Sequence, residues 1–103
     1  MKKQQNITED HLDLMHIIEN DGAVSQRLIS QNSGLSIGKV NYCLKALVDI
    51  GFIKINNFNN SNNKFNYVYI LTPKGIKEKT AITKRFIIKK RQEYDKLKSY
   101  LNS

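Results

Sequence analysis

The middle of the chain spaces its apolar residues with the period of an amphipathic α-helix. From residue 37 to about residue 50 they recur at i, i+4, i+7 and i+8, which is the spacing of a buried stripe. The members of this stripe are Val40, Leu44, Leu47 and Val48. Its burial leaves an outward face that is largely polar, with one cation and few acids, made of Ile37, Gly38, Asn41, Tyr42 and Lys45.

A shorter helix is predicted just before it, over about residues 26–32. Ser25 and Ser36 stand where an N-cap hydroxyl accepts a backbone N–H, and Gly34 lies in the turn between the two helices. Leu28 and Ile29 supply the apolar face of the shorter helix. Two such helices, the second with a polar outer face, are typical of a helix-turn-helix that enters the major groove of DNA. The same pattern also fits an ordinary helical hairpin in an unrelated core.

The flanking segments complete a small domain. Thr8 followed by two acids predicts the start of a first helix, which ends at Asp21-Gly22. Gly51 is expected just beyond the end of the third helix. Residues 52–55 and 65–71 are rich in β-branched and aromatic side chains and predict two strands, joined by an asparagine-rich loop over 56–63. Three helices followed by such a β-wing make a winged helix-turn-helix, so the expected fold class is mainly α with a small β-wing.

A long last helix follows the hairpin. Thr72 can cap it and Pro73 is tolerated at its first position. It can run to about Leu101, on the order of 40 Å at 1.5 Å per residue, which is too long to pack on so small a domain. Residues at alternating spacings of four and three form an imperfect heptad seam along it: Ile76, Thr80, Thr83, Ile87, Lys90, Tyr94, Leu97 and Leu101. We expect a winged helix domain over 7–72 and a dimerisation helix over 73–102, which pairs two copies.

The charge of the chain points to a polyanionic partner. Its 103 residues carry a formal charge of +8, with a pI near 9.7. Between residues 74 and 98 there are ten Lys or Arg and three acids, so the excess lies mainly on the last helix. We expect the acids Glu9, Asp10 and Asp13 of the first helix to lie against this basic helix, in the same subunit or in the other one.

Other classes of function find little support in the residues. No segment approaches the roughly 20 apolar residues of a membrane span, and no apolar stretch before Ile7 suggests a secretory signal, which makes the cytoplasm the expected location. Cys43 is the single cysteine and is expected to be buried rather than redox-active. His11 and His16 lack partners at metal-ligand spacing. We see no catalytic arrangement, and we expect no enzyme activity, cofactor or metal.

The segments around the third helix and the wing resemble a known family. The run Gly-Lys-Val-Asn-Tyr-Cys-Leu-Lys-Ala-Leu over residues 38–47, together with Asn57-Phe58, Asn60-Ser61 and Asn63-Lys64 in the loop, is similar to MarR-type winged helices. More narrowly it resembles the small exopolysaccharide-associated MarR-family regulators, over about residues 12–97. The Leu-Thr-Pro-x-Gly junction at 71–75 is shared among winged helices more widely. The longer MarR proteins have additional terminal helices, so their effector pocket is not implied here.

The resemblance assigns a reading role to the third helix. The positions that match the family's recognition helix are Ser36, Ile37, Gly38, Lys39, Asn41, Tyr42 and Lys45. Gly38 lacks a Cβ and lets the helix approach DNA closely. Asn41 is suited to adenine, and Lys39 or Lys45 to guanine or phosphate. Tyr42 is expected to contact a phosphate or a thymine methyl group, or else to pack against the preceding helix. Ile37 could equally hold the turn.

Further contacts are expected on either side of the recognition helix. Arg27 at the start of the second helix suits a phosphate contact. The wing offers hydrogen bonds to the sugar-phosphate backbone or the minor groove from Asn60, Asn62, Asn63 and Lys64. A plain surface loop is the competing interpretation of the wing. The dimer contacts are expected from Ile76, Thr83, Ile87, Tyr94, Leu97 and Leu101.

These observations predict a homodimeric transcriptional regulator that binds double-stranded DNA sequence-specifically. Two other functions fit the same pattern. One is a winged helix that serves as a protein-interaction module, with its basic last helix docked on an acidic partner. The other is a plasmid replication or copy-control protein, which shares the fold.

Overall fold

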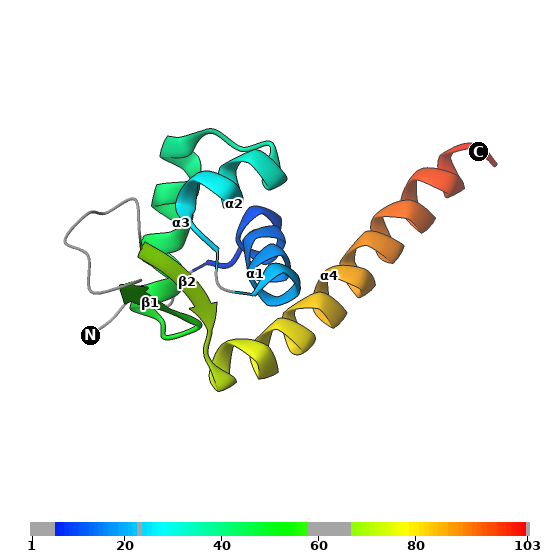
Figure 1. Cartoon of the computed structure of the whole chain (residues 1–103). Coiled ribbons are helices and arrows are strands. Elements are labelled where there is room, and N and C mark those ends of the chain that lie inside the picture. The colour runs from blue at the N-terminus through cyan, green and yellow to red at the C-terminus, as the bar shows by residue number, and fades with distance from the viewer. Residues whose placement is uncertain (1–5, 23, 58–66, 103) are drawn as a thin grey trace.

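The computed structural model describes residues 6–22, 24–57 and 67–102, and the elements follow the predicted order. Three helices, α1 (Glu9–Asp21), α2 (Gln26–Ser33) and α3 (Ile37–Asp49), precede two strands, β1 (Ile53–Asn57) and β2 (Tyr67–Leu71), and a long helix, α4 (Pro73–Tyr100). Figure 1 shows α1 between the α2–α3 pair and the start of α4, with the hairpin to one side. The described chain is therefore a winged helix domain from which α4 projects.

Each helix begins at a side-chain cap, as the sequence predicts. The hydroxyl groups of Thr8, Ser25, Ser36 and Thr72 accept backbone N–H groups from the first turns of α1, α2, α3 and α4, respectively. The cap of α1 is a capping box with His11, which the sequence analysis missed. The observed bounds of the four helices agree with the predicted ones to within about one residue.

The core is apolar and is shared by all the elements. Its largest fully buried members come from all three short helices, β1 and α4: Leu14, Met15, Ile18, Ile29, Leu44, Leu47, Ile53 and Ile82. Cys43 is also fully buried, as expected, and burial raises the pKa of its thiol. Leu28 corrects our prediction, because 42% of its surface is exposed while Ile29 is fully buried. Neighbouring helical positions point about 100° apart, so a narrow contact buries only one of the two.

The hairpin is antiparallel, with Ile53 opposite Leu71 and Asn57 opposite Tyr67. β1 begins one residue later than predicted and extends two residues into the predicted loop, while residues 65 and 66 lie outside the described part of the chain. Val24 adds a bridge on the far edge of β2, where its N–H and C=O pair with those of Tyr69. This bridge ties the α1–α2 connection to the wing.

The start of α4 is fixed to the end of α3. The Thr72 hydroxyl donates to the carbonyl oxygen of Gly51 at 2.6 Å, and the Thr72 N–H donates to that of Phe52 at 3.0 Å. Gly51 has a φ of 82°, the left-handed conformation expected just beyond a helix. Ile82 is buried and Phe86 packs half-buried on the core, so these two side chains hold the first half of α4 on its own domain.

The second half of α4 leaves the domain, and every residue from 87 to 102 is exposed. Figure 1 shows this half extending alone to the C-terminus, and the longest dimension of the molecule is 62 Å. None of the described helices has the length and apolarity needed to cross a lipid bilayer.

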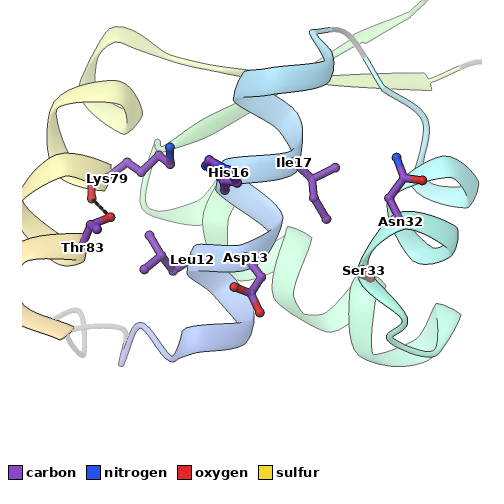
Figure 2. A pocket seen from close by; sticks show the side chains of 8 residues that line it. All are labelled: Leu12, Asp13, His16, Ile17, Asn32, Ser33, Lys79 and Thr83. Atoms are coloured by element: carbon purple, nitrogen blue, oxygen red, sulfur yellow. Dashed lines mark hydrogen bonds between the residues drawn. The ribbon is translucent and has the colours of Figure 1, made fainter. Parts of the chain in front are cut away.

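A cavity of about 470 Å³ lies where α1, α2 and α4 meet. In Figure 2, α1 runs through the middle of the view, with Lys79 and Thr83 of α4 on one side of it and Asn32 and Ser33 of α2 on the other. Leu12, Asp13, His16 and Ile17 line it from α1. The cavity includes none of the residues predicted to read DNA.

Candidate nucleic-acid interface

The turn between α2 and α3 is held by local hydrogen bonds. Gly34 has a φ of 75°, which a residue with a side chain rarely adopts, and its N–H donates to the carbonyl oxygen of Ser30 at 3.1 Å. The Ser30 hydroxyl donates to the carbonyl oxygen of Leu35 at 2.7 Å, and the Ser33 hydroxyl accepts the N–H of Leu35 at 3.1 Å. These bonds fix the direction in which α3 starts.

α3 divides into a buried and an exposed face. Its stripe is buried at Val40, Leu44 and Leu47, while Val48 is half-buried. The residues predicted to read DNA are all exposed: Ser36, Ile37, Gly38, Lys39, Asn41, Tyr42 and Lys45. The two faces follow the apolar period of the sequence, and they leave one helix side open along its whole length.

Tyr42 leaves most of its surface in solvent. It is 69% exposed, which favours contact with a partner over packing against α2. Ile37 is likewise 53% exposed, so about half of its surface is open to solvent. Two large apolar side chains on a solvent-facing surface are available to a partner such as a thymine methyl group or a sugar.

Gly38 leaves open space at the start of α3. A Cβ atom built at this position meets no heavy atom within 4 Å. The space beside the first turn is therefore open, and a phosphate or a base edge can approach the backbone closely.

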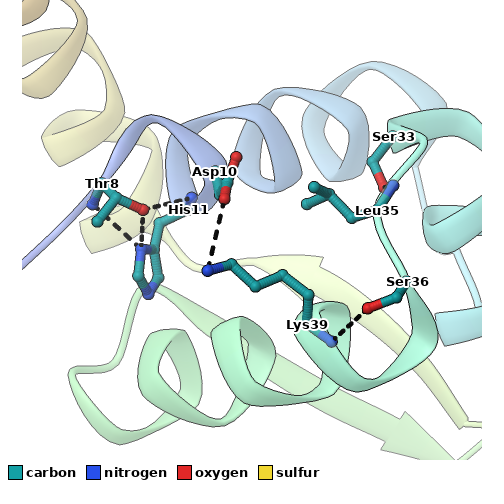
Figure 3. Close-up of polar contacts among 7 residues, drawn as sticks. All are labelled: Thr8, Asp10, His11, Ser33, Leu35, Ser36 and Lys39. Atoms are coloured by element: carbon teal, nitrogen blue, oxygen red, sulfur yellow. Dashed lines mark hydrogen bonds and ion pairs between the residues drawn. The ribbon is translucent and has the colours of Figure 1, made fainter.

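Lys39 already has an acidic neighbour in the free protein. Its Nζ lies 3.7 Å from Oδ2 of Asp10 on α1, a contact drawn in Figure 3, and both side chains are partly exposed. We expected Asp10 to lie against the last helix, in the same subunit or in the other one; within this subunit it pairs with Lys39 instead. Asp10 lies in the first turn of α1, close to the first turn of α3 that carries Lys39.

Glu9 and Glu19 do meet the basic last helix. Glu9 lies 2.7 Å from the Lys90 amine, and the Lys79 amine pairs with Glu19. Both contacts are within one subunit. The hydrogen bond that the Lys90 amine donates to the Glu9 carboxylate raises the pKa of Lys90.

The predicted reading residues extend toward the wing. A cavity of about 170 Å³ between α3 and the hairpin is lined by Asn41, Leu44, Lys45, Val48, Asp49, Ile55 and Tyr69. Sequence reasoning missed Asp49 and Ile55 as neighbours of the reading face, because their position depends on how the hairpin docks on α3. The period of α3 carried a signal for Asp49, which follows Lys45 by one helical turn.

The remaining predicted contacts fall in two places. Arg27 is exposed in the first turn of α2, where a phosphate contact needs it. Asn60, Asn62, Asn63 and Lys64 of the predicted wing loop lie outside the described residues. No group of three or more His, Cys, Asp or Glu within the described ranges could hold a metal ion.

Comparisons with known proteins agree with this arrangement. Residues 11–54 match the family model described as winged helix-turn-helix DNA-binding. The chain shares the winged-helix fold of MarR-family regulators. No curated protein matches it by sequence.

Three solved structures illustrate the likeness of the winged helix domain and α4. NMB1585, a MarR family regulator from Neisseria meningitidis, is 18% identical, with a TM-score of 0.61 over 86% of this chain and 58% of that one. FabT from Streptococcus pneumoniae, solved in complex with DNA, is 18% identical, with a TM-score of 0.66 over 89% and 62%. A mutant MarR from E. coli, complexed with operator DNA, is 20% identical, with a TM-score of 0.60 over 69% and 49%. The chain thus spans about half to three fifths of the length of these proteins.

Proposed function

We propose that this chain is a sequence-specific, DNA-binding transcriptional regulator of the MarR type. The exposed face of α3 carries the proposal: the predicted reading residues from 36 to 45 are all exposed, and the opposite face of the helix is buried in the core. α3 enters the major groove, and Arg27 on α2 contacts the backbone. Two of the similar structures, FabT and the mutant MarR, are complexes with DNA, which supports the same assignment.

The proposal gives the residues of α3 distinct roles. Asn41 offers the donor and acceptor pair that matches adenine, and Lys45 reaches guanine or phosphate. Gly38 brings the first turn close to the DNA. The wing residues Asn60, Asn62, Asn63 and Lys64 extend the contact to flanking backbone.

A homodimer completes the proposed reader. The end of α4 leaves large apolar or aromatic side chains more than half exposed: Ile87, Tyr94, Leu97 and Leu101. Together with Ile76 and Thr83 they provide the proposed contact between two copies. Two domains held by paired helices bind two half-sites about one turn of DNA apart. We place this function in the cytoplasm, with no cofactor and no enzyme activity.

A mobility-shift assay with Asn41→Ala and Lys45→Ala tests the reading face, with genomic fragments near the chain's own promoter as probes. Both variants are expected to lose affinity, by roughly 1–3 kcal/mol for each base contact removed. Lys89→Ala is the matched control, since Lys89 is an exposed cation on the second half of α4. Unchanged affinity in both α3 variants would refute the placement of the interface on α3.

The exopolysaccharide connection is a finer part of the proposal and rests on the sequence resemblance alone. It places the operator near genes for exopolysaccharide synthesis. Selection of bound sites from a random DNA pool, followed by a search of the chromosome, tests that connection separately from DNA binding itself.

A protein-interaction module is the second candidate, because the basic excess lies on α4 rather than on α3. Retention of DNA at low salt, with log affinity falling linearly in log salt, separates the regulator from this rival. A plasmid replication or copy-control role shares the same interface and is separated by gene neighbourhood.

A further inference from the structure

The seam on α4 has a spacing that reads the same in both directions. Its eight residues are separated by four, three, four, three, four, three and four positions: Ile76, Thr80, Thr83, Ile87, Lys90, Tyr94, Leu97 and Leu101. A seam with such a palindromic spacing can pair with its own reversed copy without a gap. We propose that α4 pairs with α4 of a second copy in antiparallel orientation, in the one register that uses all eight residues. This inference rests on the homodimer of the proposed function.

The register specifies four layers, each formed twice. Leu101 lies against Ile76 of the partner subunit, and Leu97 lies against Thr80 of the partner subunit. Tyr94 lies against Thr83 of the partner subunit, and Lys90 lies against Ile87 of the partner subunit. In the two middle layers, the large side chains of Leu97 and Tyr94 thus meet the small side chains of threonines.

Lys90 is the observation that separates the two orientations. In a parallel pair of the same register, each seam residue meets its own copy, so two Lys90 side chains would face each other within the seam. Each Lys90 amine keeps Glu9 of its own subunit in either orientation, but the parallel pair also brings two like charges together within the seam. In the antiparallel pair, Ile87 of the partner subunit covers the aliphatic stem of Lys90. The Lys90 amine stays with Glu9 at 2.7 Å.

The cavity beside α1 supports the same layers. Thr83 belongs both to the seam and to the lining of the 470 Å³ cavity, together with Leu12 and His16 of α1. In the antiparallel register, Tyr94 of the partner subunit lies over Thr83 and covers the edge of this cavity. The Tyr94 ring is 62% exposed in one copy and gains an apolar wall in the pair.

The outer edge of the seam makes the pairing dependent on salt. This edge is formed by four exposed cations spaced seven residues apart: Lys77, Lys84, Arg91 and Lys98. The antiparallel register places Lys98 next to Lys77 of the partner subunit, whereas the parallel one places Lys98 next to Glu93 of the partner subunit. These edge charges remain in solvent and are screened, so they weaken the antiparallel pair without reversing the preference set by the seam.

Disulfide trapping tests the register directly. Thr80→Cys and Leu97→Cys chains, both in a Cys43→Ala background, are oxidised separately and as a mixture. A disulfide needs Cα atoms within about 7 Å, while residues 80 and 97 are about 26 Å apart along one helix. The antiparallel register therefore yields a covalent dimer only between unlike chains. Both positions are exposed, so neither variant disturbs the core.

Ile88→Cys is the control for random collision, because Ile88 is 58% exposed and lies outside the seam. Cross-linking of like chains at Thr80 or Leu97 above the Ile88→Cys rate overturns the antiparallel register. A lack of cross-links in every mixture, with a monomer by light scattering, overturns the pairing itself. A mobility-shift assay on the same samples separates failure of the register from failure of the proposed function. If a dimer cross-linked between two identical variants binds DNA, the register is refuted and the proposed function stands.

A charge reversal provides an independent measurement. Lys98→Glu places an acid beside Lys77 of the partner subunit in the antiparallel pair, which lowers the dimer dissociation constant by about two- to fivefold. The parallel pair predicts the opposite sign, because the new acid would meet Glu93 of the partner subunit. Lys96→Glu makes the same change of net charge outside the seam edge and is expected to have little effect. A weaker dimer in Lys98→Glu than in Lys96→Glu would contradict the antiparallel orientation.

Discussion

Gly75 lies directly against the backbone of Phe52. A Cβ atom on Gly75 would overlap the carbonyl oxygen of Phe52 and come within 2.9 Å of its carbonyl carbon. The same carbonyl oxygen accepts the N–H of Thr72, which caps α4. Gly75 therefore allows the first turn of α4 to dock on the end of α3, and this contact sets the direction in which α4 leaves the domain.

We expect Gly75→Ala to destabilise the fold despite the higher helix propensity of alanine. Because the added methyl group meets backbone rather than a flexible side chain, the cost should be about 1–3 kcal/mol, as for other overpacked sites. The free energy of unfolding from urea titration measures it. Gly38→Ala is the matched control, since its Cβ meets nothing within 4 Å, and it should stabilise the fold by up to about 1 kcal/mol. Equal effects of both substitutions would show that Gly75 makes no such contact.

His11 gives the stability of the fold a dependence on pH. Its Nδ1 accepts the backbone N–H of Thr8 at 3.1 Å, which only a ring with a free lone pair can do. Burial lowers the pKa of His11 below its ordinary 6.5, partly offset by Asp10 and reinforced by Lys39. Since the unfolded chain takes up the proton first, the stability is complete above pH 6.5. It falls as the pH drops from there toward the lower pKa of the folded state.

The slope from this one group is at most about 1.4 kcal/mol per pH unit. Urea unfolding of the parent chain and of His11→Gln between about pH 5.5 and 7.5 isolates it, because a glutamine at this position can still complete the capping box. His16 is present in both chains and cancels in the comparison. The same slope in His11→Gln would show that His11 does not contribute.

The local signals of the sequence predicted the fold well. Thr8, Ser25, Ser36 and Thr72 all cap helices, because a cap depends only on residues within one turn of it. The period of α3 separated its buried stripe from its exposed face for the same reason. The winged helix fold followed from the order of these elements.

Contacts between distant segments were not predicted. The bridge between Val24 and Tyr69 and the ion pair between Asp10 and Lys39 join elements whose approach is set by packing. No local pattern indicates which acid on α1 meets which cation. The requirement for glycine at position 75 also comes from a distant contact. A side chain there would overlap the backbone of Phe52, which lies more than 20 residues earlier in the chain.

The ion pair between Asp10 and Lys39 bears on DNA binding. Both side chains are partly exposed, so the pair adds little stability, but its carboxylate lies beside the proposed reading face. Asp10→Asn should raise the affinity for duplex DNA several-fold, because it frees Lys39 and removes a charge that repels phosphate. A mobility-shift titration at fixed salt measures this. Glu19→Gln neutralises an acid on the same helix that faces Lys79, and it should change the affinity less. An equal gain from both variants would assign the effect to net charge alone.

The open space at Gly38 allows substitutions that separate an effect on folding from an effect on DNA binding. Gly38→Ala is expected to leave the fold intact or to stabilise it, because the new methyl group points into open space. If the first turn of α3 lies against DNA, the same methyl group must lower the affinity, and a larger side chain in Gly38→Leu must lower it further. Unfolding and mobility-shift titrations on the same preparations separate the two properties. Unchanged affinity in Gly38→Leu would mean that the start of α3 does not approach the duplex, and the contact would then have to begin further along the helix, at Asn41.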